Sequence, residues 1–233
     1  MNLKISGWNE SLIVYVLAAG APEYTIEYVD YENGWAKNGA MKNGSTYYNI
    51  PLPLGPERGG PLFLSQYSFL GINPDGLEDN YANYEIQVKN HTLINSAYCI
   101  TNPQNYYGYS EDSWGLTASD NIQGYTAHSP SNDNSVIAPT AALTSMAFTP
   151  EESLKALEFF YYKIGDKLWG TYGFKDAYSL DKVWFAESFI AINQGPILIG
   201  IENHRSGLFW KYLMQSPEIK NGLTKLKFTS PHI

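Results

Sequence analysis

Four segments of the sequence carry a start signal for an apolar helix, and their spacing narrows the folds that the chain can adopt. In one of them, "WNESLIVYVLAAGAP", Asn9 can cap the helix, and Gly20 with Pro22 ends it. In the other three, a proline stands directly before an apolar run, as at the first turn of many helices. These prolines are Pro61, Pro139 and Pro196. Each apolar segment is followed by a more amphipathic helical pattern, so we expect αα-hairpins.

The amphipathic pattern with the clearest boundaries is "TPEESLKALEFFYYKIGDKLWG". Thr149 and Glu152 have the spacing of a capping box, and Pro150 occupies the first helical position. The apolar stripe of this helix consists of Leu154, Leu157, Tyr161, Ile164 and Leu168. Apolar helices inside and amphipathic partners outside form two layers. We therefore predict an all-α fold of about four helical hairpins with long loops and little strand, apart from a short ribbon near "GSTYYNIPLPLG".

Inner helices that start at the same end gather their loops on one rim, where unpaired N–H groups and positive dipole ends also point. One connection, from about Pro103 to Pro139, shows no helical or strand period. A segment of this size is either disordered or shapes a site. It contains "EDSWGLTASD" and several tyrosines, whereas disordered segments have few aromatic residues. The sequence therefore favours a site on this rim.

Charge and composition exclude several classes of partner. The formal net charge is −8, with 15 Lys+Arg against 23 Asp+Glu and no basic run, which argues against nucleic acid. The four histidines do not fall at metal-ligand spacing, so we expect neither a metal site nor a cofactor. Cys99 is the single cysteine and is expected to be a small buried hydrophobe.

Two further features concern membranes and export. No apolar run is long enough to span a bilayer. The opening stretch "MNLKISGWNE" lacks the charged start, apolar centre and cleavage site of a secretory signal. On its residues alone, the chain would stay in the cytoplasm.

A rim rich in Trp, Tyr, Asn, Gln and carboxylates suits a carbohydrate, because sugars present apolar faces for stacking and hydroxyls for hydrogen bonds. Hydrolysis of a glycosidic bond needs two carboxyl groups. Glu10 follows a Trp-Asn pair at a helix start, and is either a general acid or a routine acidic residue near a helix dipole. Asp120 alone would favour a turn cap. Glu187 lies in the apolar "WFAESFIAI" and should be paired, hydrogen-bonded or functional.

Three other polar residues are weaker candidates. Glu202 either contacts a ligand or forms a structural pair with Arg205 or His204, and the pair is favoured. His128 lies in the long loop and is a better rim candidate than His91, which has the spacing of a packing residue in a helix.

The sequence resembles the glucoamylase-like family of Bacteroidetes and related bacteria, which includes β-1,2-glucan hydrolases. The resemblance covers nearly the whole chain through the blocks "GWNESLIVYVLA", "GGPLFLSQYSFLGINPDGL", "NYANYEIQVKNHTLIN", "WGLTASDNIQGYTAHSP", "APTAALTSM", "TPEESLKAL", "WGTYGFKDAYSL" and "WFAESFIAINQGPILIGIEN". It implies an (α/α)6 toroid, glycoside hydrolysis with inversion, and export to the periplasm or cell envelope. Family members are about twice this length, so residues 1–233 are expected to be one toroid domain, incomplete, from the C-terminal portion.

The resemblance also implies roles for particular residues. It places the general acid at Glu10 and puts Asp120 and Glu187 at pocket-facing positions. It departs at Asn193, where relatives often carry an aspartate, so a base at that position in relatives would be missing here. The expected sugar contacts are Trp8, Asn9, Trp114, His128, Gln194 and Glu202.

Two functions remain open on the sequence. The first is a glycoside hydrolase that acts on a glucan, either a β-1,2-glucan or a related glucooligosaccharide. The second is a non-catalytic carbohydrate-binding protein or a fragment. Since an incomplete toroid exposes apolar helix faces, the chain would then need its N-terminal half or associate with itself.

Overall fold

Local sequence explains where the longest helix begins and ends in the computed structural model, which describes residues 5–233. This helix is α3 (Tyr84–Thr101), and the side chain of Asn83 caps it by accepting the Ile86 N–H at 2.9 Å. Asn102 ends it in the left-handed conformation, with φ of 46°. The side chains that it buries recur every three or four residues and include Tyr84, Val88, His91, Asn95 and Cys99.

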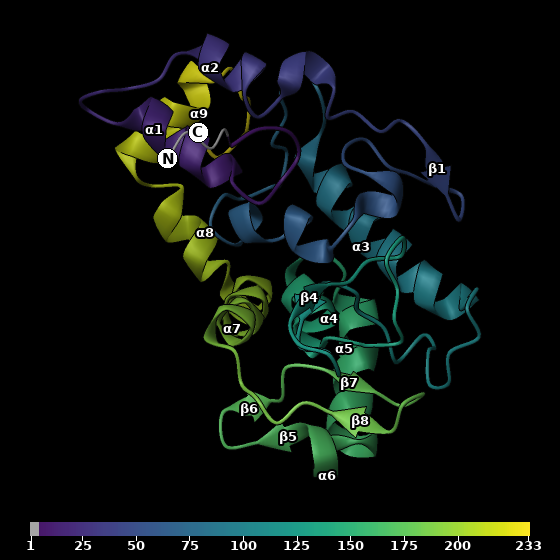
Figure 1. Cartoon of the computed structure of the whole chain (residues 1–233). Coiled ribbons are helices and arrows are strands. Elements are labelled where there is room, and N and C mark those ends of the chain that lie inside the picture. The colour runs from purple at the N-terminus through teal and green to yellow at the C-terminus, as the bar shows by residue number, and fades with distance from the viewer. Residues whose placement is uncertain (1–4) are drawn as a thin grey trace.

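The chain is mainly helical, with short strands (Figure 1). Within residues 5–233 the other α-helices are α1 (Leu12–Gly20), α2 (Tyr28–Asn33), α4 (Pro139–Thr144), α5 (Pro150–Glu158), α6 (Gly165–Leu168), α7 (Ala191–Ser206), α8 (Leu208–Leu213) and α9 (Pro217–Lys225). Short 3₁₀ turns are η1 (Lys37–Gly39), η2 (Glu57–Gly59), η3 (Leu62–Ser65), η4 (Tyr67–Leu70) and η5 (Ser145–Ala147). One π-helical segment is η6 (Phe159–Lys163).

The strands pair into antiparallel two-stranded ribbons between neighbours in the sequence. They are β1 (Thr46–Tyr47) with β2 (Ile50–Pro51), β3 (Ala118–Ser119) with β4 (Thr126–Ala127), β5 (Trp169–Gly170) with β6 (Gly173–Phe174), and β7 (Tyr178–Ser179) with β8 (Trp184–Phe185). The first ribbon confirms the prediction from "GSTYYNIPLPLG". The other three were not predicted. All these strands have only two residues, too short to show an alternating pattern, and the first ribbon was predicted because its Pro-Leu-Pro run argues against a helix.

The four predicted apolar helix starts have different outcomes. Pro139 opens α4 at its first position, as expected. The segment after Pro61 forms two 3₁₀ turns, η3 and η4, in place of an α-helix. The prediction for Pro196 is wrong in position, because α7 begins at Ala191 and contains this proline in its interior. The Asn9 segment forms α1, which begins at Leu12.

The predicted long helix after Thr149 is interrupted. It forms α5, then the π-helical η6, then α6, and Thr149 makes no side-chain cap bond. The predicted apolar stripe is correct in part. Leu168 is fully buried, and Leu157 and Ile164 pack against the second core cluster, whereas Leu154 and Tyr161 are exposed. In α5 the buried side chains are Ser153 and Ala156, and these small residues let α5 approach α4 and η5, on which it packs.

Helix packing gives two layers, but the pairing differs from a simple series of hairpins. Consecutive helices pack in α4 with α5 and in α7 with α8, and α4 also packs on α7. Helix α1, by contrast, packs most extensively on α9, at the far end of the sequence (Figure 1). The first helix of the described chain therefore takes its partner from the last helix and not from the next one.

Two clusters of buried apolar side chains form the core. One joins α1, α2, the start of α3 and α9, and includes Trp35, Tyr84 and Leu223. The other joins the end of α3, the long loop, α4 and α5, and includes Trp114 and Phe160. Helix α4 is buried on all sides, as predicted for an inner helix. Helix α1 is buried on one face only, because Val14 is 45% exposed and Leu17 is 48% exposed.

Among residues 5–233, no helix has the length and apolar character required to cross a membrane.

Candidate active site

The start of α1 is held by a side chain from η4. Ser11, at the position before the helix, makes no side-chain cap bond. In its place, Ser68 Oγ accepts the Ile13 N–H at 3.1 Å and donates to the Glu10 carbonyl at 2.6 Å. Asn9 Oδ1 accepts the Ser11 N–H at 2.8 Å and shapes the preceding turn. The backbone of Glu10 is thereby fixed against η4, two residues before α1 begins.

Pro196 leaves a carbonyl group free near the start of α7. A residue at this position normally donates its N–H to the carbonyl four residues earlier, here Ile192, and proline has no N–H. The Tyr67 hydroxyl donates to this Ile192 carbonyl at 3.3 Å. One residue further, Thr140 Oγ1 donates to the Asn193 carbonyl at 2.7 Å. The first turns of α4 and α7 and the start of η4 therefore meet at one end of the helical layer.

The long loop is folded into the β3–β4 ribbon beside this end. Asp120 directly follows β3, and Tyr125 directly precedes β4. The Asp120 N–H donates to Asp176 Oδ2 at 2.7 Å, and the Ser188 hydroxyl donates to Asp120 Oδ2. The backbone of Asp176 is in turn bonded to Ser188, whose carbonyl accepts the Asp176 N–H at 3.1 Å.

Asp176 is the most deeply buried carboxylate at this end, with 1% of its surface exposed. The Asn193 side-chain amide donates to its Oδ1 at 2.6 Å, while its Oδ2 accepts the Asp120 N–H. Burial raises the pKa of Asp176 above the usual range for an aspartate. Since both carboxyl oxygens are engaged within the protein, Asp176 orients its neighbours.

Two tyrosines show that Glu10 shares this environment. Burial raises the pKa of Tyr67, and nearby Tyr125, Glu10 and Asp176 raise it further. Burial also raises the pKa of Tyr125, with additional contributions from Asp176, Asp120 and Glu10. Glu10 and Asp176 act on both hydroxyls and Asp120 acts on that of Tyr125, so the three acidic residues lie near this pair of tyrosines. We call Glu10, Asp120 and Asp176 the carboxylate cluster.

The members of the carboxylate cluster differ in their surroundings. Glu10 is exposed, Asp120 is half-buried and accepts a hydroxyl hydrogen bond, and Asp176 is buried. Acid–base catalysis needs a proton donor and a proton acceptor, and two carboxyl groups at one site can fill these roles. In the described part of the chain, no group of three or more His, Cys, Asp or Glu side chains is arranged to hold a metal ion.

Glu187 lies outside the carboxylate cluster. Its side chain is 85% exposed and forms an ion pair with Lys175 at 3.0 Å. The next residue, Ser188, reaches Asp120, and successive side chains of an extended segment point to opposite sides. The carboxylate that stood out in "WFAESFIAI", Glu187, is therefore one residue before Ser188, the polar residue of this segment that contacts the cluster.

Trp114 and Glu202 also lie away from the carboxylate cluster. Trp114 is fully buried in the second core cluster, and its indole N–H donates to the Glu152 carbonyl at 3.4 Å. Glu202 pairs with Arg205 at 2.9 Å and accepts the Ser206 hydroxyl at 2.6 Å on the surface of α7. Of the two alternatives for Glu202, the structure therefore shows the ion pair with Arg205.

His128 and Gln194 differ in their relation to the cluster. The His128 imidazole lies beside the Asp120 backbone. His128 is fully buried, and burial lowers its pKa to about 4, so its imidazole is neutral at pH 7. Gln194 donates its amide to the Phe174 carbonyl at 2.7 Å. It also lines a mainly apolar cavity of about 210 Å³, together with Trp169 and Tyr172.

Trp8 stacks at the edge of the first core cluster. Its ring centroid lies 5.3 Å from that of Trp35 and 6.4 Å from that of Tyr84. Trp8 also lines a cavity of about 270 Å³ with Lys37 and Gly55. It is therefore two residues from Glu10 in the sequence but serves mainly as a packing residue.

Sequence reasoning missed several polar residues at this end. Asp176 stands in "FKDAYSL", between aromatic residues, which is the same signal that drew attention to Glu187. Tyr67 and Ser68 interrupt the apolar run after Pro61, and could have been noticed for that reason. Nothing in the local sequence distinguishes Tyr125 from the other tyrosines of the loop.

Comparisons with known proteins identify the family of the chain. A model of the Glycoamylase family, described as "Putative glucoamylase", matches residues 2–217. The exo beta-1,2-glucooligosaccharide sophorohydrolase of Parabacteroides distasonis is 41% identical over 246 residues, which covers 97% of this chain and 34% of that protein.

Solved structures are also similar over nearly the whole chain. A "putative glucoamylase" from Bacteroides uniformis has a TM-score of 0.96 and 55% identity, covering 98% of this chain and 56% of that one. The endo-beta-1,2-glucanase of Chitinophaga pinensis, in a complex with sophorotriose and glucose, has a TM-score of 0.97 and 49% identity, covering 100% and 57%. The chain thus spans between one third and three fifths of the length of these relatives. Because the family model spans most of the sequence, the chain belongs to the Glycoamylase family.

Proposed function

We propose that this chain contributes catalytic carboxylates to a glycoside hydrolase that acts on β-1,2-linked glucooligosaccharides. The observation that carries the proposal is the carboxylate cluster. Asp176 holds the Asp120 N–H, and Ser68 holds the Glu10 carbonyl beside Tyr67. The names of the relatives support the substrate class, since one is a sophorohydrolase and another was solved with sophorotriose and glucose.

The surroundings of the two accessible carboxyls support different roles. Asp120 is held in place by the Ser188 hydroxyl and by the bond from its N–H to Asp176, and would act as the general base. Glu10 is exposed, has its backbone fixed by Ser68 and would act as the general acid. In the inverting reaction, Glu10 gives its proton to the glycosidic oxygen as the bond from that oxygen to the anomeric carbon breaks. Asp120 takes a proton from the water that forms the new bond to the anomeric carbon.

Asp176 and Asn193 support these residues without touching the sugar. Asp176 holds the backbone of Asp120 through its N–H, and Asn193 donates an amide hydrogen to Asp176. An aspartate in place of Asn193 would put a second carboxyl against Asp176, and the pair would share a proton. The amide in this chain fixes the geometry without that proton, so the base role falls to Asp120.

We also infer that residues 1–233 belong to one (α/α)6 toroid domain. Support comes from the two helical layers and from the meeting of helix starts at one end. A pocket at that end would place the carboxylate cluster and the exposed ring of Tyr125 against a sugar.

The test compares Glu10→Gln, Asp120→Asn and Glu187→Gln in hydrolysis of sophoro-oligosaccharides, with binding measured separately by calorimetry. We expect the first two variants to lose turnover by about 10²–10⁴-fold and to keep sugar binding, because each removes a proton-transfer group. Glu187→Gln is the matched control and should keep its rate, since that carboxylate is exposed and pairs with Lys175. NMR of the first product should show the inverted anomer.

Three outcomes would contradict the proposal. The first is unchanged turnover in both Glu10→Gln and Asp120→Asn. The second is loss of turnover in Glu187→Gln alone. The third is sugar binding without hydrolysis by the unaltered protein, which would indicate a carbohydrate-binding protein.

A further inference from the structure

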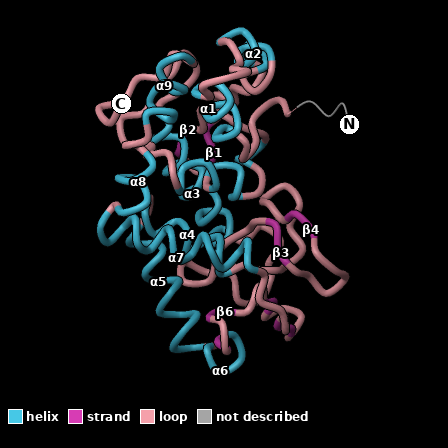
Figure 2. The backbone as a smooth tube through the Cα atoms, turned by 90° about the vertical axis from the view of Figure 1, so that its left-hand side faces the viewer, coloured by secondary structure: helices cyan, strands magenta, loops and turns pink. Residues whose placement is uncertain are grey.

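A hollow lies at the end of these helical segments that is opposite to the carboxylate cluster. η4 begins with Tyr67 at the carboxylate cluster, and the chain that follows its end reaches this hollow at Asn73. Likewise, α4 begins with Thr140 beside the cluster, and the end of η5 reaches the hollow at Phe148. Helix α7 has 16 residues, so its two ends are about 24 Å apart. Figure 2 shows the β3–β4 ribbon on one side of the helical layer and α8 on the other.

The hollow, which we call the far-end pocket, has a volume of about 300 Å³. It is lined by Asn73, Pro74, Asp75, Glu85, Val88, Lys89, Ala147, Phe148 and Trp210. Pockets for small ligands start at about this size, and a single sugar ring falls within it.

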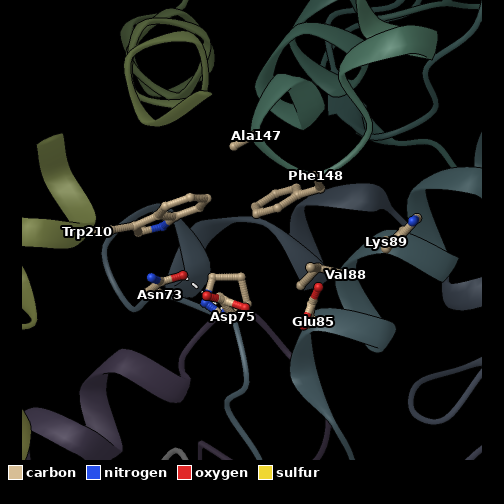
Figure 3. A pocket seen from close by; sticks show the side chains of 9 residues that line it. Asn73, Asp75, Glu85, Val88, Lys89, Ala147, Phe148 and Trp210 are labelled. Carbon is tan, nitrogen blue, oxygen red and sulfur yellow. Dashed lines mark hydrogen bonds between the residues drawn. The ribbon is translucent and has the colours of Figure 1, made fainter. Parts of the chain in front are cut away.

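One wall of the far-end pocket is aromatic. The ring centroids of Phe148 and Trp210 are 6.3 Å apart, with the planes tilted by 33°. The Trp210 indole N–H donates to the Phe69 carbonyl at 2.7 Å, so the ring is held in place before any ligand arrives. Figure 3 shows the two rings side by side above the polar residues. Such a wall offers a fixed apolar surface for the C–H face of a sugar.

The facing wall is polar. Asn73 Oδ1 accepts the Asp75 N–H at 3.0 Å, which leaves the amide hydrogens of Asn73 to donate. Glu85 lies below the aromatic rings, and its carboxylate can accept from ligand hydroxyls (Figure 3). Lys89 supplies an ammonium donor on the same helix. Donors and acceptors therefore stand together opposite an apolar wall, which is the combination that a sugar ring requires.

The pocket continues beyond its own lining. A neighbouring cavity of about 320 Å³ shares Asn73 and Trp210 with it, and extends past Met214 and Lys220 to His232. The indole of Trp210 is thus common to two adjoining hollows. A chain of linked sugar units could pass along this ring, whereas a compact ligand would occupy one hollow only.

We propose that the far-end pocket is a non-catalytic binding site for a neutral saccharide, separate from the carboxylate cluster. A cationic amine fits less well, because Lys89 opposes it and Asp75 is already bonded to His232 at 3.1 Å. A neutral polyol satisfies the aromatic wall, the Glu85 acceptor and the Asn73 donor together.

The test follows Trp210 directly by ¹⁹F NMR of protein labelled with 5-fluorotryptophan. The chain has 6 tryptophans, and Trp210→Phe identifies the resonance of interest. On titration with glucose and then sophorose, we expect this resonance to shift saturably. Glu85→Gln should weaken the apparent affinity about tenfold, because a charged acceptor becomes a neutral one. Glu151→Gln, at an exposed position in α5, is the matched control and should leave the affinity unchanged.

Asp120→Asn separates this site from the proposed active site. The Trp210 shift should persist in Asp120→Asn even if hydrolysis is lost, because that residue lies at the other end of the helices. The inference is overturned if the Trp210 resonance stays still at saturating sugar, if methylammonium moves it in place of sugar, or if Glu85→Gln and Glu151→Gln titrate alike. Circular dichroism of Glu85→Gln confirms that a lost response does not come from unfolding.

Discussion

At the scale of single residues, the molecule is organised around polar groups whose partners come from distant parts of the chain. Asp176 bonds to the backbone of Asp120 and to the side chain of Asn193, and no short stretch of sequence contains all three. Ser68 similarly completes the start of α1 from η4. Such residues determine the geometry of the carboxylate cluster although they are not themselves expected to touch a sugar.

Asp176 gives a testable dependence of stability on pH. Its pKa in the folded protein is raised from 3.8, so the protonated form is favoured by folding. Its contribution to stability is present below the pKa of the unfolded chain and is lost as pH rises through the folded value. The side chain in Asp176→Asn does not titrate. As pH rises from acidic to neutral, we therefore expect the unfolding free energy of the original protein to fall relative to that of the variant. Each unit of pKa difference corresponds to about 1.4 kcal/mol.

Urea unfolding of both proteins at several pH values measures this difference. The control is Glu23→Gln, an exposed glutamate after α1, for which the difference should stay nearly constant. A constant difference for Asp176→Asn as well would show that burial does not act on this carboxyl.

At the scale of elements, close approach between helices depends on glycine. A Cβ atom added at Gly200 in α7 would lie 2.4 Å from the Thr144 carbonyl oxygen of α4. At Gly195, in the same helix, a Cβ would meet nothing within 4 Å. The first glycine is required by packing on α4, and the second is not.

The two glycines therefore provide a matched pair of variants. We expect Gly200→Ala to lower the unfolding free energy by about 1–3 kcal/mol, because α7 must move away from α4. Gly195→Ala should leave it unchanged or raise it by up to about 1 kcal/mol, because alanine favours the helix. Thermal and urea unfolding of both variants measure these free energies. Equal changes in the two variants would show that α4 and α7 can separate without loss of stability.

The same elements show what sequence could and could not predict. Some local signals were correct, such as Pro139 and Pro150 at the first turns of α4 and α5, whereas Pro61 precedes a 3₁₀ turn and Thr149 makes no side-chain cap bond. The prediction for Pro196 was wrong because a proline inside a helix and a proline at its start look alike in the sequence. They can be told apart only when the hydrogen-bond partner of the freed Ile192 carbonyl is known. That partner, Tyr67, is 125 residues away, so no local pattern announces it.

The candidate site was predictable to a similar extent. Glu10 was a candidate because it stands at a helix start, and Asp120 became one through the family resemblance; both lie near Tyr125 in the structure. Trp114 was misplaced because a buried tryptophan and a rim tryptophan look alike in a loop. Asp176 was missed because its importance lies in its contacts, which depend on the tertiary fold.

At the scale of the whole molecule, the two clusters of buried side chains predict two regions of different local stability. Leu223 of α9 is fully buried in the cluster that contains α1 and α2. We expect Leu223→Ala to cost about 2–5 kcal/mol and to speed amide exchange in α1, α2 and α9 more than in α4 and α5. Hydrogen exchange with mass spectrometry resolves the regions.

A matching substitution in the other core cluster serves as the comparison. Leu143→Ala in α4 removes a fully buried side chain of similar size and should speed exchange in α4 and α5 first. If both variants raised exchange uniformly along the chain, the two clusters would form a single cooperative unit.

The contact of α1 with α9 also bears on how the chain is made. A Cβ at Gly222 would lie 2.0 Å from the Val16 carbonyl oxygen, so these helices touch backbone to backbone across about 200 residues of sequence. A ribosome adds about 5–20 residues per second. The apolar face of a newly made α1 is therefore exposed for roughly 10–40 s before α9, the helix that covers it, has been synthesised. During that interval chaperones have their chief opportunity to shield it.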